Sequence, residues 1–257
     1  FRTCKCFFAS SFINARPMKS VYLRLFAFGL LAAFSQAQLF AQKAPGKYYV
    51  IANAGLNQRV GEATSSKKMM TVPYGTKVEI LQKATSSNLT VDGLSGGMAK
   101  IKCNGTVGYM FDGYLVRFPA PTNGEKTEDY IAKLWEDELD AMKEEINRDY
   151  GGYYQSEDGL YISKISWGDA FLMAKNHFGI PATFKFPGEK GSGEKVVKNV
   201  NAHKEAWTDE LTAKYEGGKL VDLYYSYRTD GSGSVIGVEL SKNNGYKFRI
   251  YERLIAD

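Results

Sequence analysis

The sequence predicts a mainly β protein, in which a small β-barrel is followed by an α+β domain with an antiparallel meander sheet and two helices. Three observations predict this fold class. Short β-branched and aromatic runs, separated by Gly, Asn and Ser, fill residues 48–115. Apolar residues then recur every three or four positions in two segments, which is typical of amphipathic helices. Alternating runs with tight turns fill residues 207–250.

Residues 45–118 are expected to form the barrel. Their apolar runs are short, as in Tyr48–Ile51 and Val78–Leu81. Pro73-Tyr74-Gly75 and Asn104-Gly105 are turn sequences, because Pro presets φ and Gly tolerates positive φ. Five or six strands in fewer than 80 residues cannot bury an open sheet on both faces, so we expect the sheet to close.

A linker is expected at residues 119–125, where Pro119, Pro121 and Gly124 interrupt any apolar period. The α+β domain, residues 126–257, follows. Directly after the linker the short β-branched runs end, and apolar residues recur at helical spacing.

Two helices are expected in the α+β domain. The first extends from Thr127 to Arg148, with apolar residues on one face and the carboxylates of residues 136–145 on the solvated face. The second follows Ser166, whose side chain forms a capping box with Asp169, and ends at Gly179. Between them, residues 153–165 are expected to form a hairpin that turns at Glu157-Asp158-Gly159.

The C-terminal part predicts a four-stranded antiparallel meander. The expected strands are residues 207–215, 220–227, 235–240 and 246–250, and Gly-containing turns join them. Two helices can then cover one face of the sheet, which gives the α+β class.

The N-terminus has the composition of an export signal. From Met18 a short basic region precedes an uncharged apolar run, and Ser35-Gln36-Ala37 provides small residues for cleavage. We therefore expect residues 1–37 to be an upstream segment and a signal peptide, and the mature protein to be periplasmic or secreted. An uncleaved anchor and a buried helix are the alternatives. Contact with a membrane is expected only through this segment, before cleavage.

The net charge of +5 does not indicate a nucleic-acid partner. Five basic residues and no acidic ones precede Gln38, and removing these five from the 33 Lys and Arg leaves 28, equal to the 28 Asp and Glu. Catalytic patterns are also missing. Cys103 is the one cysteine after the signal, and His177 and His203 are too few for a zinc site. We expect no catalytic residue, metal or cofactor.

Three motifs in the first segment carry a family resemblance: Leu56–Gly61, with Asn57 and Arg59; Val72–Val78, with Tyr74; and Asn104–Tyr109. This series resembles the bacterial SH3-like (SH3b) domain, a small β-barrel of exported, cell-wall-associated proteins. The resemblance covers about residues 48–115, and Met98 stands where the family often has Trp.

The resemblance implies a groove that binds short peptides. Carried over to this sequence, the implied ligand-binding residues are Asn57, Arg59, Tyr74, Tyr109, Asp112 and Tyr114. It implies an exported, non-enzymatic protein of the cell envelope that binds or tethers to a peptide or glycan of the cell wall. Two alternatives stay open: a hydrolase of unfamiliar type in the C-terminal domain, and an adaptor whose partner is another exported protein.

Overall fold

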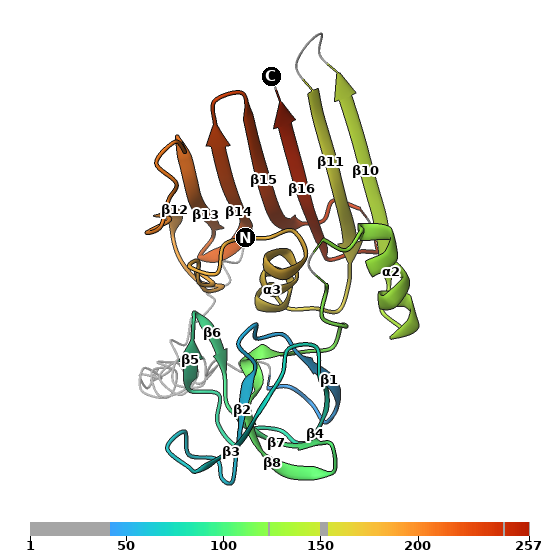
Figure 1. Ribbon diagram of the computed structural model, residues 1–257, viewed down its shortest axis with the longest axis vertical. Coiled ribbons are helices and arrows are strands. Elements are labelled where there is room, and N and C mark those ends of the chain that lie inside the picture. Colours follow the sequence, from blue (N-terminus) through green and yellow to red (C-terminus); the bar gives the residue numbers. More distant parts are fainter. Residues whose placement is uncertain (1–41, 123, 150–153, 244, 257) are drawn as a thin grey trace, which may run out of the picture. The chain divides into compact units, whose positions relative to one another are not determined.

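The computed structural model of the chain describes residues 42–122, 124–149, 154–243 and 245–256 (Figure 1). These residues form antiparallel sheets and two α-helices, which confirms the expected mainly β class. They all belong to one compact unit, residues 40–257. The predicted export signal and the segment before it lie outside the described residues.

The first seven-stranded sheet, which we call the N-terminal sheet, has the strand order β3-β2-β8-β7-β4-β1-β9. Its strands are β1 (Gly46–Val50), β2 (Leu56–Arg59), β3 (Lys68–Val72), β4 (Lys77–Gln82), β7 (Met98–Cys103), β8 (Thr106–Phe111) and β9 (Leu115–Val116). A separate hairpin, β5 (Leu89–Val91) with β6 (Leu94–Gly96), and a 3-10 turn at Asp112–Tyr114 accompany it. Described pairing ends at β3 and β9, so closure into a barrel stays a prediction.

Alternation along these strands separates a buried face from an exposed one. The smaller hydrophobic cluster lies on the buried face and contains Tyr48, Val50, Val72, Val78, Ile80, Ala99, Ile101, Cys103, Met110 and Leu115. The turn between β7 and β8 confirms a prediction from the sequence, since Asn104 and Gly105 have φ of +46° and +81°. Cys103 is buried beside this turn, as its position on a strand predicts.

The first helix is shorter than predicted. Helix α2 extends from Thr127 to Glu136, and residues Ala141–Asp149 form strand β10. The expected helix to Arg148 is therefore wrong in its second half. The apolar residues Met142 and Ile146 have a spacing that fits a helix, but their side chains lie on one face of a strand.

A Schellman motif ends α2. The N–H of Glu138 donates to the Trp135 carbonyl at 3.0 Å, and the N–H of Leu139 donates to the Leu134 carbonyl at 2.9 Å. Glu138 takes φ of +61° at the position where such motifs usually have Gly. The helix therefore ends without the glycine that would have marked its end in the sequence.

The second seven-stranded sheet, the C-terminal sheet, has the order β10-β11-β16-β15-β14-β13-β12. Besides β10 it contains β11 (Tyr154–Ile162), β12 (Gly193–Lys198), β13 (Thr208–Glu216), β14 (Lys219–Thr229), β15 (Ser232–Leu240) and β16 (Phe248–Ala256). The predicted four-stranded meander is confirmed as β13 to β16. Strands β10 and β12, which the sequence did not predict, and β11, whose residues were predicted to form a hairpin, extend it on both sides.

The expected hairpin turn at Glu157-Asp158-Gly159 is wrong, because β11 passes through these residues without interruption. Gly159 is needed there for a close approach. A Cβ at this position would lie 2.8 Å from the Ile250 carbonyl oxygen and 2.9 Å from the Tyr251 Cβ. The glycine marks tight packing against the neighbouring strand β16 and not a turn.

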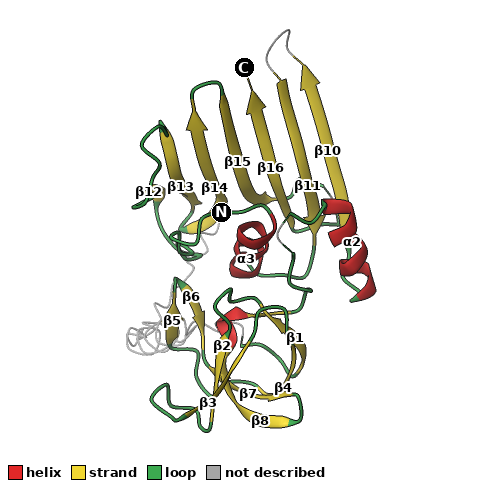
Figure 2. Ribbon diagram, viewed as in Figure 1, coloured by secondary structure: helices red, strands yellow, loops and turns green. Residues whose placement is uncertain are grey.

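Helix α3 (Trp167–His177) confirms the second predicted helix. Its cap is Ser166, whose Oγ accepts from the Asp169 N–H at 3.1 Å, while Asp169 Oδ2 accepts from the Ser166 N–H at 3.2 Å. Figure 2 shows the two helices with the C-terminal sheet, and α3 contacts β15 and β16 whereas α2 contacts β10 and β11.

The larger hydrophobic cluster forms between the helices and one face of the C-terminal sheet. It also includes Ile51, Leu94, Val116 and Phe118 from the first part of the chain. Pro119, at the start of the connecting segment, is held beside it, since Tyr130 Oη donates to the Pro119 carbonyl at 3.0 Å. The opposite face of the C-terminal sheet, which we call the open face, carries polar and charged side chains.

Candidate functional site

Three of the six predicted ligand-binding residues lie on adjacent strands. Arg59 of β2 faces Tyr109 of β8, and Arg59 Nη1 donates to the Ser66 carbonyl at 2.7 Å. Asn57 is exposed, and its Oδ1 accepts a hydrogen bond from Thr71 Oγ1 at 3.2 Å. Arg59 and Asn57 therefore make contacts that stabilise the neighbouring strands and turns.

Tyr74 and Tyr114 pack against the larger hydrophobic cluster. Tyr74 Oη donates to the Pro121 carbonyl at 2.8 Å, and burial, followed by the charge of Glu125, raises the pKa of Tyr74 to about 12. Tyr114 Oη donates to Asp92 Oδ2 at 2.7 Å. Both hydroxyls are thus used inside the protein, and the two rings are half-buried.

Asp112, the sixth predicted residue, is only 2% exposed. One carboxylate oxygen accepts the Gly97 N–H at 2.7 Å, which fixes the 3-10 turn against β7. Burial raises the pKa of Asp112, and the hydrogen bond from Gly97 opposes this. Met98 is buried as well. The structure therefore does not bring the six residues to one place. None of them lines the cavity beside β1, β4 and the end of α2.

A cavity of about 610 Å³ lies beside β1, β4 and the end of α2, and we call it the charged cavity. It is lined by four cationic side chains, three carboxylates, one tyrosine and one leucine: Lys47, Lys77, Arg117, Lys164, Glu136, Asp137, Glu138, Tyr49 and Leu139. None of these residues was predicted from the sequence to belong to a site.

Strand alternation in β1 directs the side chains of Lys47 and Tyr49 to the cavity. In β1, Tyr48 and Val50 are buried in the smaller cluster, so Lys47 and Tyr49 lie on the opposite face. Lys77 of β4 is the register partner of Tyr49, and its Nζ lies 4.8 Å from the centroid of the Tyr49 ring. The cation and the ring are therefore adjacent, at a distance suited to a cation–π contact.

Asp137 connects this strand pair to α2. Its Oδ2 accepts a hydrogen bond from Tyr49 Oη, and its Oδ1 pairs with Lys77 Nζ at 3.3 Å. Burial and the hydrogen bond to Asp137 raise the pKa of Tyr49. The pKa of Lys77 is also raised, first by its hydrogen bond with Tyr49. Both groups therefore keep their protons at neutral pH.

Two residues that line the charged cavity have a left-handed backbone. Four non-glycine residues in the described part of the chain have positive φ: Asp92, Asn104, Glu138 and Lys164. Two of them line the cavity, Glu138 with φ of +61° and Lys164 with φ of +60°. A Cβ in this conformation costs on the order of 1 kcal/mol, and such strain is often found at functional sites.

Seven of the nine side chains that line the charged cavity are charged, and both signs are present. The cavity offers cations and carboxylates in reach of one open space, so it can bind a ligand that carries both signs of charge. Neither His nor Cys is among its lining residues, and burial raises the pKa of its tyrosine. In the described residues no group of three or more metal-ligating side chains is present.

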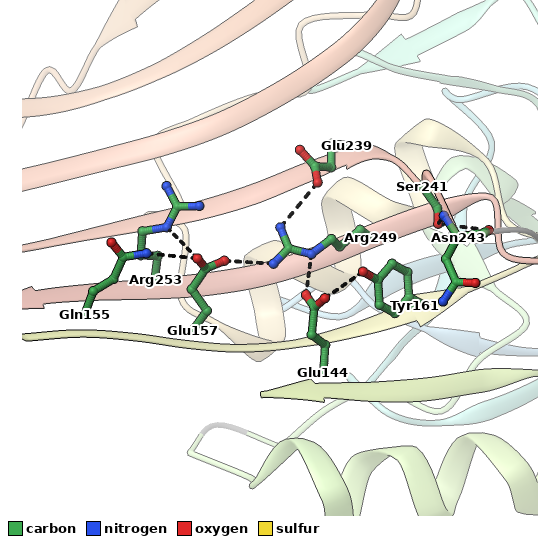
Figure 3. Close-up of polar contacts among 9 residues, drawn as sticks. All are labelled: Glu144, Gln155, Glu157, Tyr161, Glu239, Ser241, Asn243, Arg249 and Arg253. Carbon is green, nitrogen blue, oxygen red and sulfur yellow. Dashed lines mark hydrogen bonds and ion pairs between the residues drawn. The ribbon is translucent and has the colours of Figure 1, made fainter. Parts of the chain in front are cut away.

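A second polar cluster lies on the open face of the C-terminal sheet and is centred on Arg249 (Figure 3). The guanidinium pairs with Glu157 at 2.8 Å, with Glu239 at 3.3 Å and with Glu144. Arg253 Nε lies 3.1 Å from Glu157. These contacts connect β10, β11, β15 and β16, so Glu144 belongs to a sheet network and not to the solvated helix face predicted for it.

Glu157 is 3% exposed and is the most buried carboxylate of this network. Burial by itself raises the pKa of Glu157, but the hydrogen bond from Arg249 and the charge of Arg253 outweigh it and hold the pKa below its ordinary value. A carboxylate that stays ionised between two guanidinium groups is a poor proton donor. The network is therefore best explained as the element that holds the strands of the open face together.

A third cluster joins α2, α3 and β11. Thr127 Oγ1 donates to Asp158 Oδ2 at 2.6 Å and lies 3.1 Å from His177 Nε2. Because Thr127 donates to Asp158, His177 Nε2 must supply the proton of the second hydrogen bond. In a nucleophilic relay the histidine stands between the hydroxyl and the carboxylate, whereas here the hydroxyl stands between the other two. This cluster lacks the geometry of a hydrolase relay.

Comparison of the chain with models of protein families, with curated proteins and with solved structures gives no match. Within the described residues, neither helix has the length and apolar character that crossing a bilayer requires.

Proposed function

We propose that the protein is an exported, non-enzymatic binding protein of the bacterial cell envelope that holds a charged peptide of the cell wall in the charged cavity. The SH3-like domain implied by the sequence supplies Lys47, Tyr49, Lys77 and Arg117. The residues at and after the end of α2, with Lys164, complete the site. The export signal predicted from Met18 supports the location, and the family resemblance supports the class of ligand.

The single observation that carries this proposal is the arrangement of opposite charges around Tyr49. Asp137 is already paired with Tyr49 and Lys77, which leaves Lys47 and Lys164, and Arg117 beside the Tyr48 ring, as cations for ligand carboxylates. Glu136 and Glu138 are exposed and can receive a ligand amine. Wall peptides carry free carboxylates and free amines on a short chain, so they match this pattern better than a neutral glycan does.

The first test uses insoluble wall material. Purified protein is incubated with isolated peptidoglycan, the pellet is assayed for bound protein, and the supernatant is assayed for released fragments. We expect co-sedimentation that weakens as salt is raised, since the contacts are between exposed charges. Lys47→Ala combined with Lys164→Gly should reduce the bound fraction, while Lys83→Ala, at an exposed lysine outside the cavity, should not.

The other outcomes separate the alternatives. Release of soluble fragments would favour the hydrolase, and an unchanged bound fraction for the double variant would place binding elsewhere. Absence of the protein from the pellet, together with capture of one exported protein that is lost in the double variant, would favour the adaptor.

A further inference from the structure

Strand β12 (Gly193–Lys198) is an edge strand of the C-terminal sheet, and it is exposed to solvent along its whole length. All six of its residues are exposed, and Val196 and Val197 are 48% and 52% exposed. Its inner side pairs with β13, and no other described strand pairs with its outer side. An exposed edge with apolar side chains is a template for pairing with another strand.

The hydrogen bonds of β12 show which of its backbone groups are free. The N–H of Asn199, just after the strand, donates to the Asp209 carbonyl at 2.8 Å. In an antiparallel ladder, alternate residues direct both backbone groups to the same neighbour. Residues 195 and 197 therefore bond to β13, and Glu194, Val196 and Lys198 direct their N–H and C=O groups outward.

The same three residues share one face. Glu194, Val196 and Lys198 are the register partners of Lys214, Thr212 and Glu210 in β13. Residues 211, 213 and 215 of β13 are buried in the larger cluster, so the side chains of Glu194, Val196 and Lys198 lie on the open face. The outward backbone groups thus belong to residues with an acidic, an apolar and a basic side chain, in that order.

This order is self-complementary. We propose that β12 pairs antiparallel with β12 of a second copy of this chain, about a two-fold axis at Val196. Val196 then faces Val196 of the partner copy, and each Glu194 faces Lys198 of the partner copy, which gives two ion pairs. All outward N–H and C=O groups of these residues are paired in the same register.

Neighbouring registers are poorer. Antiparallel pairing of outward-directed residues allows shifts of the axis by one residue, which place Glu194 opposite Val196 in one direction and Val196 opposite Lys198 in the other. Both shifts leave charges opposite valines. The charge pattern therefore favours a second copy in one register over an unrelated strand. This inference goes beyond the proposed function, because β12 does not line the charged cavity.

The test is a charge exchange followed by light scattering after gel filtration. The unmodified protein should be a dimer at micromolar concentration. Glu194→Lys alone places two lysine pairs across the axis, and Lys198→Glu alone places two glutamate pairs there. Each should raise the dimer dissociation constant at least about tenfold. The double variant Glu194→Lys/Lys198→Glu restores opposite charges and should dimerise like the unmodified protein.

The double variant is also the control for effects within one chain. It contains both changes opposite Lys214 and Glu210, so a loss of dimer in the single variants but not in the double variant cannot originate in β13. Val196→Pro provides a second test, because it removes an outward N–H and spares the bonds to β13. A monomeric unmodified protein, or a dimer that neither the single charge variants nor Val196→Pro weaken, would overturn the proposal.

Discussion

Tyr49 of strand β1 donates a hydrogen bond to Asp137, the residue that caps the C-terminal end of α2. The two residues are 88 positions apart in the sequence. Lys77 contacts both of them, the ring of Tyr49 and the carboxylate of Asp137. This group of three connects the strand pair β1–β4 to the end of α2, and all three residues line the charged cavity.

The first prediction concerns this hydrogen bond. Tyr49→Phe removes the hydroxyl and leaves Asp137 with Lys77 alone, so the free energy of unfolding should fall by about 1 kcal/mol. Urea unfolding at pH 7 measures the change. Tyr109→Phe is the matched control, because its hydroxyl has no hydrogen-bond partner in the described residues. Equal stability of both variants would show that the contact does not hold the cavity walls.

The second prediction separates stability from binding. Lys164→Gly relieves the left-handed backbone at φ +60° and should stabilise the fold by about 0.5–1 kcal/mol. It also removes one cation from the charged cavity, so ligand binding should weaken. Thermal unfolding and a binding titration on the same sample give both values. If the variant is more stable but binds the ligand with unchanged affinity, Lys164 does not belong to the binding site.

The third prediction is a pH dependence that originates at His177. Burial lowers the pKa of His177, while the charges of Asp158 and Glu125 oppose this in part. Below the ordinary histidine pKa of about 6.5, the unfolded chain binds a proton that the folded chain resists. The free energy of unfolding should therefore fall as the pH drops from 7 towards 5.

His177→Gln should flatten this part of the pH profile, even if it lowers stability at every pH. Urea unfolding at several pH values between 5 and 7.5 measures the slope. His203 is exposed, and His203→Gln serves as the histidine control. A slope that is the same in all three proteins would place the pH dependence in other groups.

The fourth prediction concerns the network on the open face. Arg249→Leu leaves Glu157 buried beside only one guanidinium and should cost about 3 kcal/mol. Arg253→Leu should cost less, because Arg249 still pairs with Glu157. Urea unfolding ranks the two variants. The reverse order of stability would refute the central role of Arg249.

Local signals in the sequence predicted local structure well. The capping box of Ser166 and Asp169 and the glycine at 179 belong to residues that are neighbours in the chain, and α3 begins and ends there. The turn at Asn104-Gly105 and the meander strands β13 to β16 were predicted for the same reason. In each case the interaction that defines the element lies within a few residues.

The errors arose where distant contacts decide the structure. Residues 127–148 have helical spacing throughout, yet the Schellman motif at Glu138 ends α2 and β11 pairs with residues 141–149. Gly159 was predicted to be a turn residue, but it makes room for Tyr251, about 90 positions later. A glycine required by a neighbouring strand is indistinguishable, in sequence, from a glycine required by a turn.

The charged cavity could be predicted only in part. Strand alternation in β1 indicates that Lys47 and Tyr49 share a face, but nothing in the sequence shows that Asp137 meets them. The SH3-like resemblance directed attention to Tyr74 and Tyr114 instead, which pack against the larger hydrophobic cluster. The position of α2 relative to β1 is a tertiary property and leaves no local pattern.

Titration of the purified protein with a short synthetic wall peptide, which has a free amine and free carboxylates and lacks sugar, tests the central claim most directly. Calorimetry should show saturable binding by the unmodified protein and by Lys83→Ala. The double variant Lys47→Ala/Lys164→Gly should bind at least about tenfold more weakly while remaining folded. Equal affinity of the double variant, or no binding by the unmodified protein at low salt, would contradict the assignment of the charged cavity as the ligand site.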